Sequence, residues 1–457
     1  DTLVFNGDFS GGLALHGSQM NSVETIRLAA GHSYNVTTDA AFHSVEFDGS
    51  QLGAGDSLVY DGTATVAGVD IWGGAGNDVI TVGTSAFFDL SKGGNDTVNG
   101  GSGNDGFYMG ATLTASDHLD GGGATNTLEL NGNYSSGLVL GPDTLLNFDK
   151  LTLDSGFSYS ITTNDGMVAA GHTLQVVDIG TSLTFDGSAE TDGAFSITAL
   201  GGVVNLVGGA GSDVFSVPVN GIASDSVDGG GGNDTLLLTS IGSSPLTTLG
   251  SNVMQGIETL ELQQANVKSL DSDVAAGHTL NVVVGGDSSF DGSHETDGAF
   301  NVTVDDTGKF TGGAGDDTIH SLGRSSVKGG LGADTIINGS QIYYGSVEES
   351  TSTGHDFDTV GPGVLFHLWF AMTGVDASVT SGSLSEASFD SDLAAAVGAP
   401  QLGSNHAVVF SPTSGDLAGD HFLVVDANGT AGYQAGQDLV IELGPGATSF
   451  TTANFAH

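Results

Sequence analysis

Short runs in which apolar and polar residues alternate occur along most of the chain. In segments 25–28, 150–153 and 259–262, leucine or isoleucine stands at every second position. Alternation with a period of two is the pattern of strands that bury one face. Gly, Asn and Asp residues separate the runs, as is typical of turns between short strands. The pattern therefore predicts an all-β fold. Strands are also expected at 422–425 and 439–443, on either side of a turn.

One helix is predicted, from Ser388 to Val397. Ser388 is a suitable N-cap residue, and Asp390 and Asp392 follow in the first turn, where carboxylates favour a helix. Gly398 ends the segment.

Longer blocks of sequence also recur. Segment 1–7 returns at 126–132 and more loosely at 234–238, and segment 23–28 returns at 148–153 and 257–262. Repeats of this kind indicate a solenoid, in which each coil buries its apolar row against the next. We therefore predict a parallel β-roll or β-solenoid in three tandem units, followed by a small β-rich C-terminal domain with one helix. The predicted ranges are 1–125, 126–233, 234–340 and 341–457.

A glycine-rich motif, Gly-Gly-x-Gly-x-Asp, occurs six times. The copies begin at residues 73, 100, 208, 229, 312 and 329, and two degenerate copies span 91–96 and 121–126. Glycine adopts positive φ easily, so such a turn can aim several carbonyl oxygens inward, and the Asp adds a charged oxygen. An irregular cage of oxygen ligands suits calcium better than the smaller magnesium. Glycines that only made turns would not explain an Asp at the same position of every copy.

The copies are also paired along the chain. Paired copies begin 17 to 21 residues apart, and a coil of two nine-residue halves repeats about every 18 residues. Paired turns should therefore stack on one edge, with an ion between them. The predicted pairs are Asp78 with Asp96, Asp213 with Asp234 and Asp317 with Asp334; a pair of Asp105 with Asn126 is weaker, because Asn is neutral. The candidate ligands are Gly73, Ala75, Asn77, Asp78, Asp96, Gly100, Ser102, Asp105, Gly208, Ala210, Asp213, Gly229, Gly231, Asp234, Gly312, Ala314, Asp317, Gly329, Leu331 and Asp334.

These copies resemble the repeats-in-toxin (RTX), or haemolysin-type, calcium-binding family, whose repeat reads G-G-x-G-x-D-x-U-x with U a large apolar residue. The resemblance implies a β-roll that binds several calcium ions. Segments 343–346 and 422–455 look similar to the C-terminal domains of proteins exported by the type I route, although the ending 455–457 is less apolar than usual. The resemblance thus implies an extracellular or bacterial cell-surface location.

Three weaker candidates lie outside these copies. Asp186, Glu190 and Asp192, and their repeat Asp291, Glu295 and Asp297, each place three carboxylates within seven residues. Each group fits either a further calcium loop or a solvated acidic turn. Near the C-terminus, Asp426, Asn428, Thr430 and Asp438 resemble the start of an EF-hand loop, but the glycine and the last acidic residue are displaced, so a plain turn remains the alternative.

Composition narrows the function classes. Lys and Arg number 7 against 54 Asp and Glu, for a net charge of -47, which disfavours nucleic acid and anionic membranes as partners. Hydrophobic residues make up 38%, which disfavours disorder. The chain has no cysteine, which excludes disulfides and thiol chemistry. Carboxylates that bind divalent cations are the better explanation of the acidity.

Enzyme motifs are missing as well. His294-Glu295 begins a zinc-protease pattern, but Gly298 stands where the second histidine belongs. We therefore expect no enzyme but a secreted calcium-binding structural protein, a surface-layer or extracellular-matrix component that assembles with itself. The alternatives are a calcium-dependent adhesin or glycan-binding module for cell-surface polysaccharide, and, third, a polysaccharide-active enzyme.

Overall fold

The computed structural model describes residues 1–240, 242, 244–338, 341–447 and 449–457. Its contacts divide the chain into two compact units. Unit 1 comprises residues 1–235 and 254–257, and unit 2 comprises residues 236–253 and 258–457. The finer division into three repeats stays a prediction, and its boundary at residue 340 falls outside the described residues.

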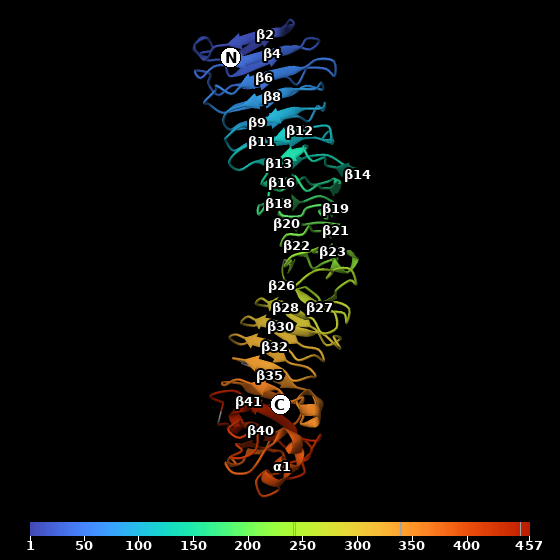
Figure 1. The fold of residues 1–457 in the computed structure, drawn as a ribbon, viewed down its shortest axis with the longest axis vertical. Coiled ribbons are helices and arrows are strands. Elements are labelled where there is room, and N and C mark those ends of the chain that lie inside the picture. Colours follow the sequence, from blue (N-terminus) through green and yellow to red (C-terminus); the bar gives the residue numbers. More distant parts are fainter. Residues whose placement is uncertain (241, 243, 339–340, 448) are drawn as a thin grey trace. The chain divides into compact units, whose positions relative to one another are not determined.

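Unit 1 is a two-sided coil of parallel strands, as predicted (Figure 1). The chain runs through a strand on one side, a turn, and a strand on the other side. One side comprises β1 (Thr2–Phe5), β3 (Thr25–Leu28), β5 (Glu46–Asp48), β7 (Val69–Trp72), β9 (Ala86–Asp89), β11 (Gly106–Met109), β13 (Thr127–Leu130), β16 (Lys150–Leu153), β18 (Thr173–Asp178), β20 (Ala194–Ala199) and β22 (Val214–Pro218). The other comprises β2 (Phe9–Leu15), β4 (Tyr34–Thr38), β6 (Leu58–Gly62), β8 (Val79–Val82), β10 (Thr97–Asn99), β12 (His118–Asp120) and β15 (Leu145–Leu146), then β14 (Tyr134–Val139), β17 (Ser158–Thr162), β19 (Ser182–Asp186), β21 (Val203–Val207) and β23 (Ser226–Asp228).

Unit 2 repeats this arrangement and ends differently. Its first side comprises β24 (Thr235–Thr239, of which Thr235 belongs to unit 1), β26 (Thr259–Gln263), β28 (Thr279–Val284), β30 (Ala299–Val304), β32 (Thr318–Ser321), β34 (Thr335–Ile337) and β36 (Thr359–Val360). The second comprises β25 (Thr247–Thr248), β27 (Asn266–Lys268), β29 (Ser289–Asp291), β31 (Lys309–Thr311), β33 (Ser326–Lys328), β35 (Gln341–Tyr344), β37 (Leu365–Leu368) and β42 (Phe455–Ala456). The C-terminal part adds β38 (Gly374–Val375), β39 (His406–Phe410), β40 (Phe422–Val425) and β41 (Leu439–Leu443). Strands β39, β40 and β41 are antiparallel, and β41 pairs in parallel with β36.

Alternate residues of the coils form the core. Phe290, Phe300 and Phe310 come from three successive strands, are at most 2% exposed, and contact one another with ring centroids 5.2 to 5.9 Å apart. The apolar residue two places after the motif Asp is buried in each of Ile80, Phe215, Leu236, Ile319 and Ile336. Parallel sheets are stable when their apolar faces are buried. These rows of interlocked side chains bury the inner faces of the two sides of the coil and so stabilise them.

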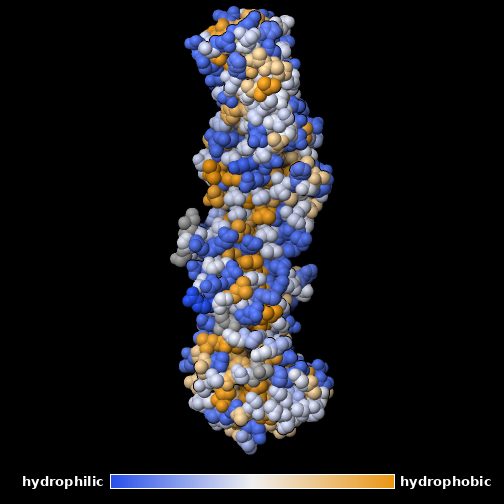
Figure 2. All heavy atoms as spheres, turned by 90° about the vertical axis from the view of Figure 1, so that its left-hand side faces the viewer, coloured by the Kyte–Doolittle hydropathy of each residue, from blue (hydrophilic) through white to orange (hydrophobic). Residues whose placement is uncertain are grey.

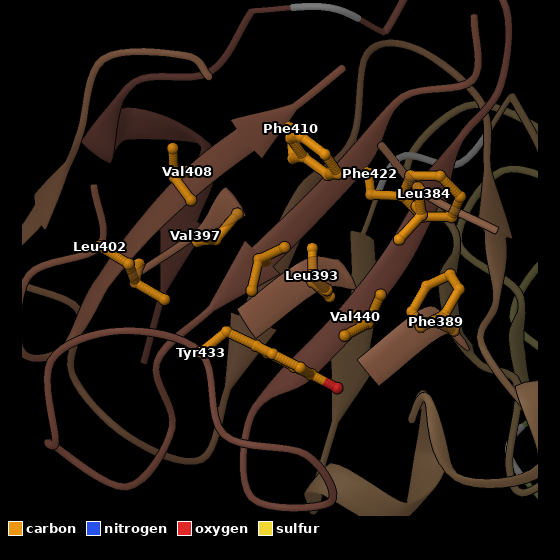
Figure 3. Packing of buried hydrophobic residues seen from close by; sticks show 11 residues of the cluster. Leu384, Phe389, Leu393, Val397, Leu402, Val408, Phe410, Phe422, Tyr433 and Val440 are labelled. Carbon is orange, nitrogen blue, oxygen red and sulfur yellow. The ribbon is translucent and has the colours of Figure 1, made fainter. Parts of the chain in front are cut away.

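The C-terminal part has its own apolar cluster, centred on α1 (Phe389–Ala396), the one α-helix in the described residues. Figure 3 shows Leu393 and Phe389 of α1 lying over β40 and β41, close to Phe422 and Val440. The predicted helix is confirmed to within a residue at each end. Ser388 precedes it, but its hydroxyl donates to the Asp392 carboxylate, 2.7 Å away, and caps no backbone N–H.

Candidate calcium sites

The glycine-rich turns occupy the two edges of the coil, where the chain passes from one side to the other. Turns 73–78 and 91–96 lead from the first side to the second, whereas turns 100–105 and 121–126 lead back at the opposite edge. Four further turns lead into the first side, at 208–213 and 229–234 in unit 1 and at 312–317 and 329–334 in unit 2. Each predicted pair of turns therefore lies on one edge, in successive coils.

The aspartates of paired turns are joined by a repeated hydrogen bond. The backbone N–H of Asp78 donates to Oδ1 of Asp96 at 2.9 Å, and both residues are 1% exposed. The same bond joins Asp213 to Asp234 at 2.7 Å and Asp317 to Asp334 at 2.9 Å. We call these stacked residues the aspartate ladder. It brings together each of the three pairs expected from spacing.

The ladder contains two aspartates that sequence reasoning missed. The N–H of Asp96 donates to Oδ1 of Asp117 at 2.8 Å, and that of Asp334 donates to Oδ1 of Asp358 at 3.1 Å. Neither residue follows a glycine-rich turn. Both begin an Asp-x-apolar sequence, with Leu119 and Val360 two places later, and this short pattern was the available signal.

Asn126 is the neutral member of the ladder. Its Oδ1 accepts the N–H of Asp105 at 3.0 Å, as an aspartate would. Its amide nitrogen then donates to the carbonyl oxygens of Gly123 and Asn147. An amide therefore keeps the bond between coils, but it presents a donor where aspartate presents an anionic oxygen.

Four ladder aspartates have one oxygen that the protein does not satisfy. Oδ2 is buried and accepts no hydrogen bond in Asp96, Asp105, Asp317 and Asp334. None of the ion pairs found in the described residues includes these four. A buried anionic oxygen without a partner is unfavourable by several kcal/mol, on the order of the penalty for a buried charge. A cation at these oxygens would remove that penalty.

The first glycine of each turn leaves room beside this oxygen. A Cβ on Gly100 would lie 2.5 Å from Oδ2 of Asp105 and 2.8 Å from the carbonyl oxygen of Gly121 in the next coil. A Cβ on Gly208 would clash in the same way with Asp213 and Gly229. A carboxylate oxygen and a carbonyl oxygen thus converge beside a Cα without a side chain, which fits a cation with oxygen ligands.

Backbone hydrogen bonds show which carbonyls remain for such an ion. The carbonyl of the second residue of a turn accepts the N–H of the third residue one coil later, from Gly123 to Gly101, Gly231 to Gly209 and Leu331 to Gly313, at 2.7 to 2.9 Å. Apart from Gly123, whose carbonyl accepts the Asn126 amide, the carbonyl oxygens of the first and third residues accept no hydrogen bond among those found in the described chain. These are the positions that the sequence predicted as ligands, from Gly73 and Ala75 to Gly329 and Leu331.

Burial also changes the acidity of the ladder. Burial raises the pKa of Asp96, Asp105 and Asp317 to about 7. It also raises the pKa of Asp334, and the nearby charge of Asp358 adds to the rise. A bound cation favours the charged form and would oppose this shift. The oxygen ligands, the buried Oδ2 atoms without partners and the raised pKa values together fit a site for a divalent cation.

The structure brings together two of the three carboxylates in each of the two acidic groups that the sequence analysis singled out outside the glycine-rich turns. Glu190 with Asp192, and Glu295 with Asp297, each form a cluster, but the third member is Asp165 or Asp271 from the preceding coil. Asp186 instead accepts two hydrogen bonds from Ser188, and Asp291 lies 3.6 Å from Lys268.

The EF-hand-like residues lie close together in unit 2. Both oxygens of Asp426 and both of Asp438 accept N–H groups, from backbone amides and, for Asp438, also from the Asn428 side chain. Thr430 is exposed. With every carboxylate oxygen engaged, this arrangement is that of a tight polar turn, and a cation here stays a prediction.

Comparison with protein-family models matches residues 70–85, 92–111 and 221–237 to the RTX calcium-binding nonapeptide repeat, in four copies. The matched segments contain the turns of Asp78, Asp105 and Asp234 and most of the turn of Asp96. The chain contains an RTX-type calcium-binding β-roll. Its repeats bind several calcium ions, and outside the matched segments the turns of Asp213, Asp317 and Asp334 make the same hydrogen bond between successive coils.

Comparisons with curated proteins and with solved structures gave no match. Within the described part of the β-roll and its C-terminal region, no helix has the length and apolar character needed to cross a membrane.

Proposed function

We propose that this β-roll protein is a secreted structural component of a bacterial surface layer or extracellular matrix. In this proposal the chain folds on binding extracellular calcium and then assembles with further copies of itself. The observation that carries the proposal is the aspartate ladder, whose buried Oδ2 atoms lack partners in Asp96, Asp105, Asp317 and Asp334. Without a cation these groups oppose the fold, so the fold depends on the ion.

The charge of the chain supports a calcium-dependent folding step. At a net charge of -47, the carboxylates repel one another and favour an extended chain where calcium is scarce, as in the cytosol. Calcium outside the cell would be held by Oδ2 of the ladder aspartates and by first- and third-residue carbonyls. Because the sites exist only in the folded coil, the free energy of binding becomes free energy of folding. RTX repeats are typical of extracellular proteins exported by the type I route, which fits this order of events.

The surface supports a structural role. Figure 2 shows hydrophilic residues interspersed with hydrophobic ones across the face turned to the viewer. Exposed apolar side chains include Val79 and Val214, the first residues of β8 and β22, at 44% and 40% exposure. Exposed apolar residues on an acidic protein offer contacts for another copy, once calcium reduces the repulsion between the chains.

Circular dichroism with calcium and with excess EDTA tests the folding step, and electron microscopy with sedimentation tests assembly. We expect β-structure in calcium and its loss in EDTA, and sheets or filaments only with calcium. A chain equally folded in both would overturn calcium-dependent folding. A strict monomer at high protein and calcium concentration would overturn self-assembly, and glycan-array binding by that monomer would support the adhesin alternative.

A further inference from the structure

Two carboxylate clusters lie outside the glycine-rich turns. Asp165, Glu190 and Asp192 form one in unit 1, and Asp271, Glu295 and Asp297 form the other in unit 2. Within each cluster, one oxygen of every carboxylate lies within 4.8 Å of the others. The glutamate and the second aspartate follow β19 or β29, and the first aspartate belongs to the preceding coil. The same arrangement thus occurs twice.

A threonine joins the two coils at each cluster. The backbone N–H and the hydroxyl of Thr191 both donate to Oδ1 of Asp165, with the N–H at 2.9 Å. Thr296 donates to Asp271 in the same way, at 2.9 and 2.6 Å. These bonds hold the first aspartate beside the glutamate of the next coil.

The glutamates are buried with an unsatisfied oxygen. Glu190 and Glu295 are 1% exposed, and Oε1 of each accepts a backbone N–H of its own turn, from Gly193 at 2.9 Å and from Gly298 at 2.8 Å. Oε2 of each is buried and has no hydrogen-bond partner. None of the ion pairs in the described residues includes a member of either cluster. A buried carboxylate beside two others is unfavourable unless a cation joins them.

A third copy of this turn shows that the fold does not need the carboxylate. The N–H of Leu52 donates to Gly49, and its carbonyl accepts the N–H of Ala75, at 2.9 and 3.0 Å. Glu190 makes the equivalent bonds with Gly187 and Ala210, both at 2.9 Å. Leu52 is 2% exposed, so an apolar side chain fills this place and builds the same turn. The glutamate in the other copies therefore has a role besides turn formation.

We propose that each cluster binds one divalent cation, with calcium as the fitting ion, through its three carboxylates. The glutamate is the buried anchor, and the two exposed aspartates leave the ion partly hydrated. Open sites of this kind in extracellular proteins bind calcium with dissociation constants of about 10⁻⁴–10⁻³ M. The inference goes beyond the proposed function, because it needs neither the glycine-rich turns nor self-assembly. The unit 1 cluster is the cleaner case, because Lys268 and His294 line the same depression as Asp271 in unit 2.

The test counts the calcium ions bound by the full chain at millimolar calcium, by equilibrium dialysis and isothermal titration. We expect Asp165→Asn and Glu190→Leu each to bind one ion fewer than the parent, and Asp165→Asn with Asp271→Asn to bind two fewer. Asp143→Asn, at an exposed aspartate of unit 1, is the matched control and should bind the parent's number. Asp186→Asn should also keep that number, because Asp186 lies outside the cluster.

An unchanged ion count in Asp165→Asn and in the double variant would overturn the proposal. If Glu190→Leu failed to fold, Asp165→Asn would still test the proposal, because Asp165 is exposed and its replacement leaves the core intact. A lower ion count in Asp317→Asn, with an unchanged count in the cluster variants, would support calcium binding at the ladder and overturn calcium binding at the clusters. A chain that loses ions as expected yet never assembles would reject only the surface-layer proposal.

Discussion

At the scale of single residues, four ladder aspartates, Asp96, Asp105, Asp317 and Asp334, divide their two oxygens between two tasks. Oδ1 holds the backbone of the neighbouring coil, as between Asp317 and Phe300 at 2.7 Å. Oδ2 of Asp317 stays unsatisfied and faces the converging carbonyl of Gly329. Asn126 shows that a neutral amide can perform the first task. The charge therefore serves cation binding and not the connection between coils.

The raised pKa values predict how the calcium-free protein depends on pH. Asp96, Asp105 and Asp317 have a pKa of about 7 when folded, against the ordinary value of about 4 for an unfolded aspartate. Between these values the folded state binds more protons, so its stability falls as pH rises through that window. In calcium-free buffer, circular dichroism should show more β-structure at pH 5 than at pH 8, and saturating calcium should remove the difference.

Asp317→Asn sharpens this prediction. The variant has no charge to bury, so its calcium-free fold should persist to higher pH than that of the parent, while its ion count falls. Asp305→Asn, at an exposed aspartate of the same unit, should leave the pH profile unchanged. Calcium-free folding that improves with rising pH would contradict the role given to these carboxylates.

At the scale of elements, each glycine-rich turn brings a carboxylate oxygen and a carbonyl oxygen together beside the Cα of its first glycine, which has no side chain. A Cβ on Gly208 would clash with Asp213 Oδ2 and the Gly229 carbonyl, whereas a Cβ on Gly55 would meet nothing within 4 Å. Backbone atoms cannot move aside as the end of a flexible side chain can. The first glycine is therefore needed for close approach and not for flexibility.

Gly208→Ala should consequently destabilise the calcium-bound protein by on the order of 1–3 kcal/mol, the usual range for overpacking, and should weaken calcium binding. Gly55→Ala, also in unit 1, should change the free energy of unfolding by less than about 0.5 kcal/mol, as for most surface substitutions. Urea denaturation in saturating calcium measures both. Equal effects of the two variants would show that the site beside Gly208 is not tightly packed.

At the scale of the whole molecule, charge and burial set different requirements. A net charge of -47 produces long-range repulsion, which any salt screens. The unsatisfied oxygens of Asp96 and Asp334 are buried and demand a bound ion. Only a cation that accepts several oxygen ligands in irregular geometry meets both requirements.

Calcium, magnesium and sodium chloride should therefore differ at matched ionic strength. We expect calcium to restore the β-signal of the EDTA-treated chain at millimolar concentration, magnesium to need far more, and sodium chloride to fail, because magnesium prefers octahedral geometry and keeps its water. Far-UV circular dichroism during titration with each salt provides the measurement. Folding by sodium chloride alone would mean that screening, and not site binding, drives folding.

Local patterns were enough to predict much of this protein. Alternation predicted strands of the coil, short apolar runs predicted β40 and β41 to the residue, and the caps around 388–398 predicted α1. The spacing of the glycine-rich turns predicted which aspartates would stack, because a coil of about 17 to 21 residues returns the chain to the same edge. The match to the RTX repeat then confirmed the family and its calcium.

Other features depended on contacts between coils of unequal length. Asp117 and Asp358 join the ladder without a glycine-rich turn, and Asp165 displaces Asp186 as the partner of Glu190. Spacing within one turn carries no information about which loop of the preceding coil lies beside it. The sequence alone determined the strand period, the repeats and the chemistry of the ligands, since these are local. Only the tertiary structure decided which carboxylates meet and which oxygens stay unsatisfied, because both depend on how successive coils stack.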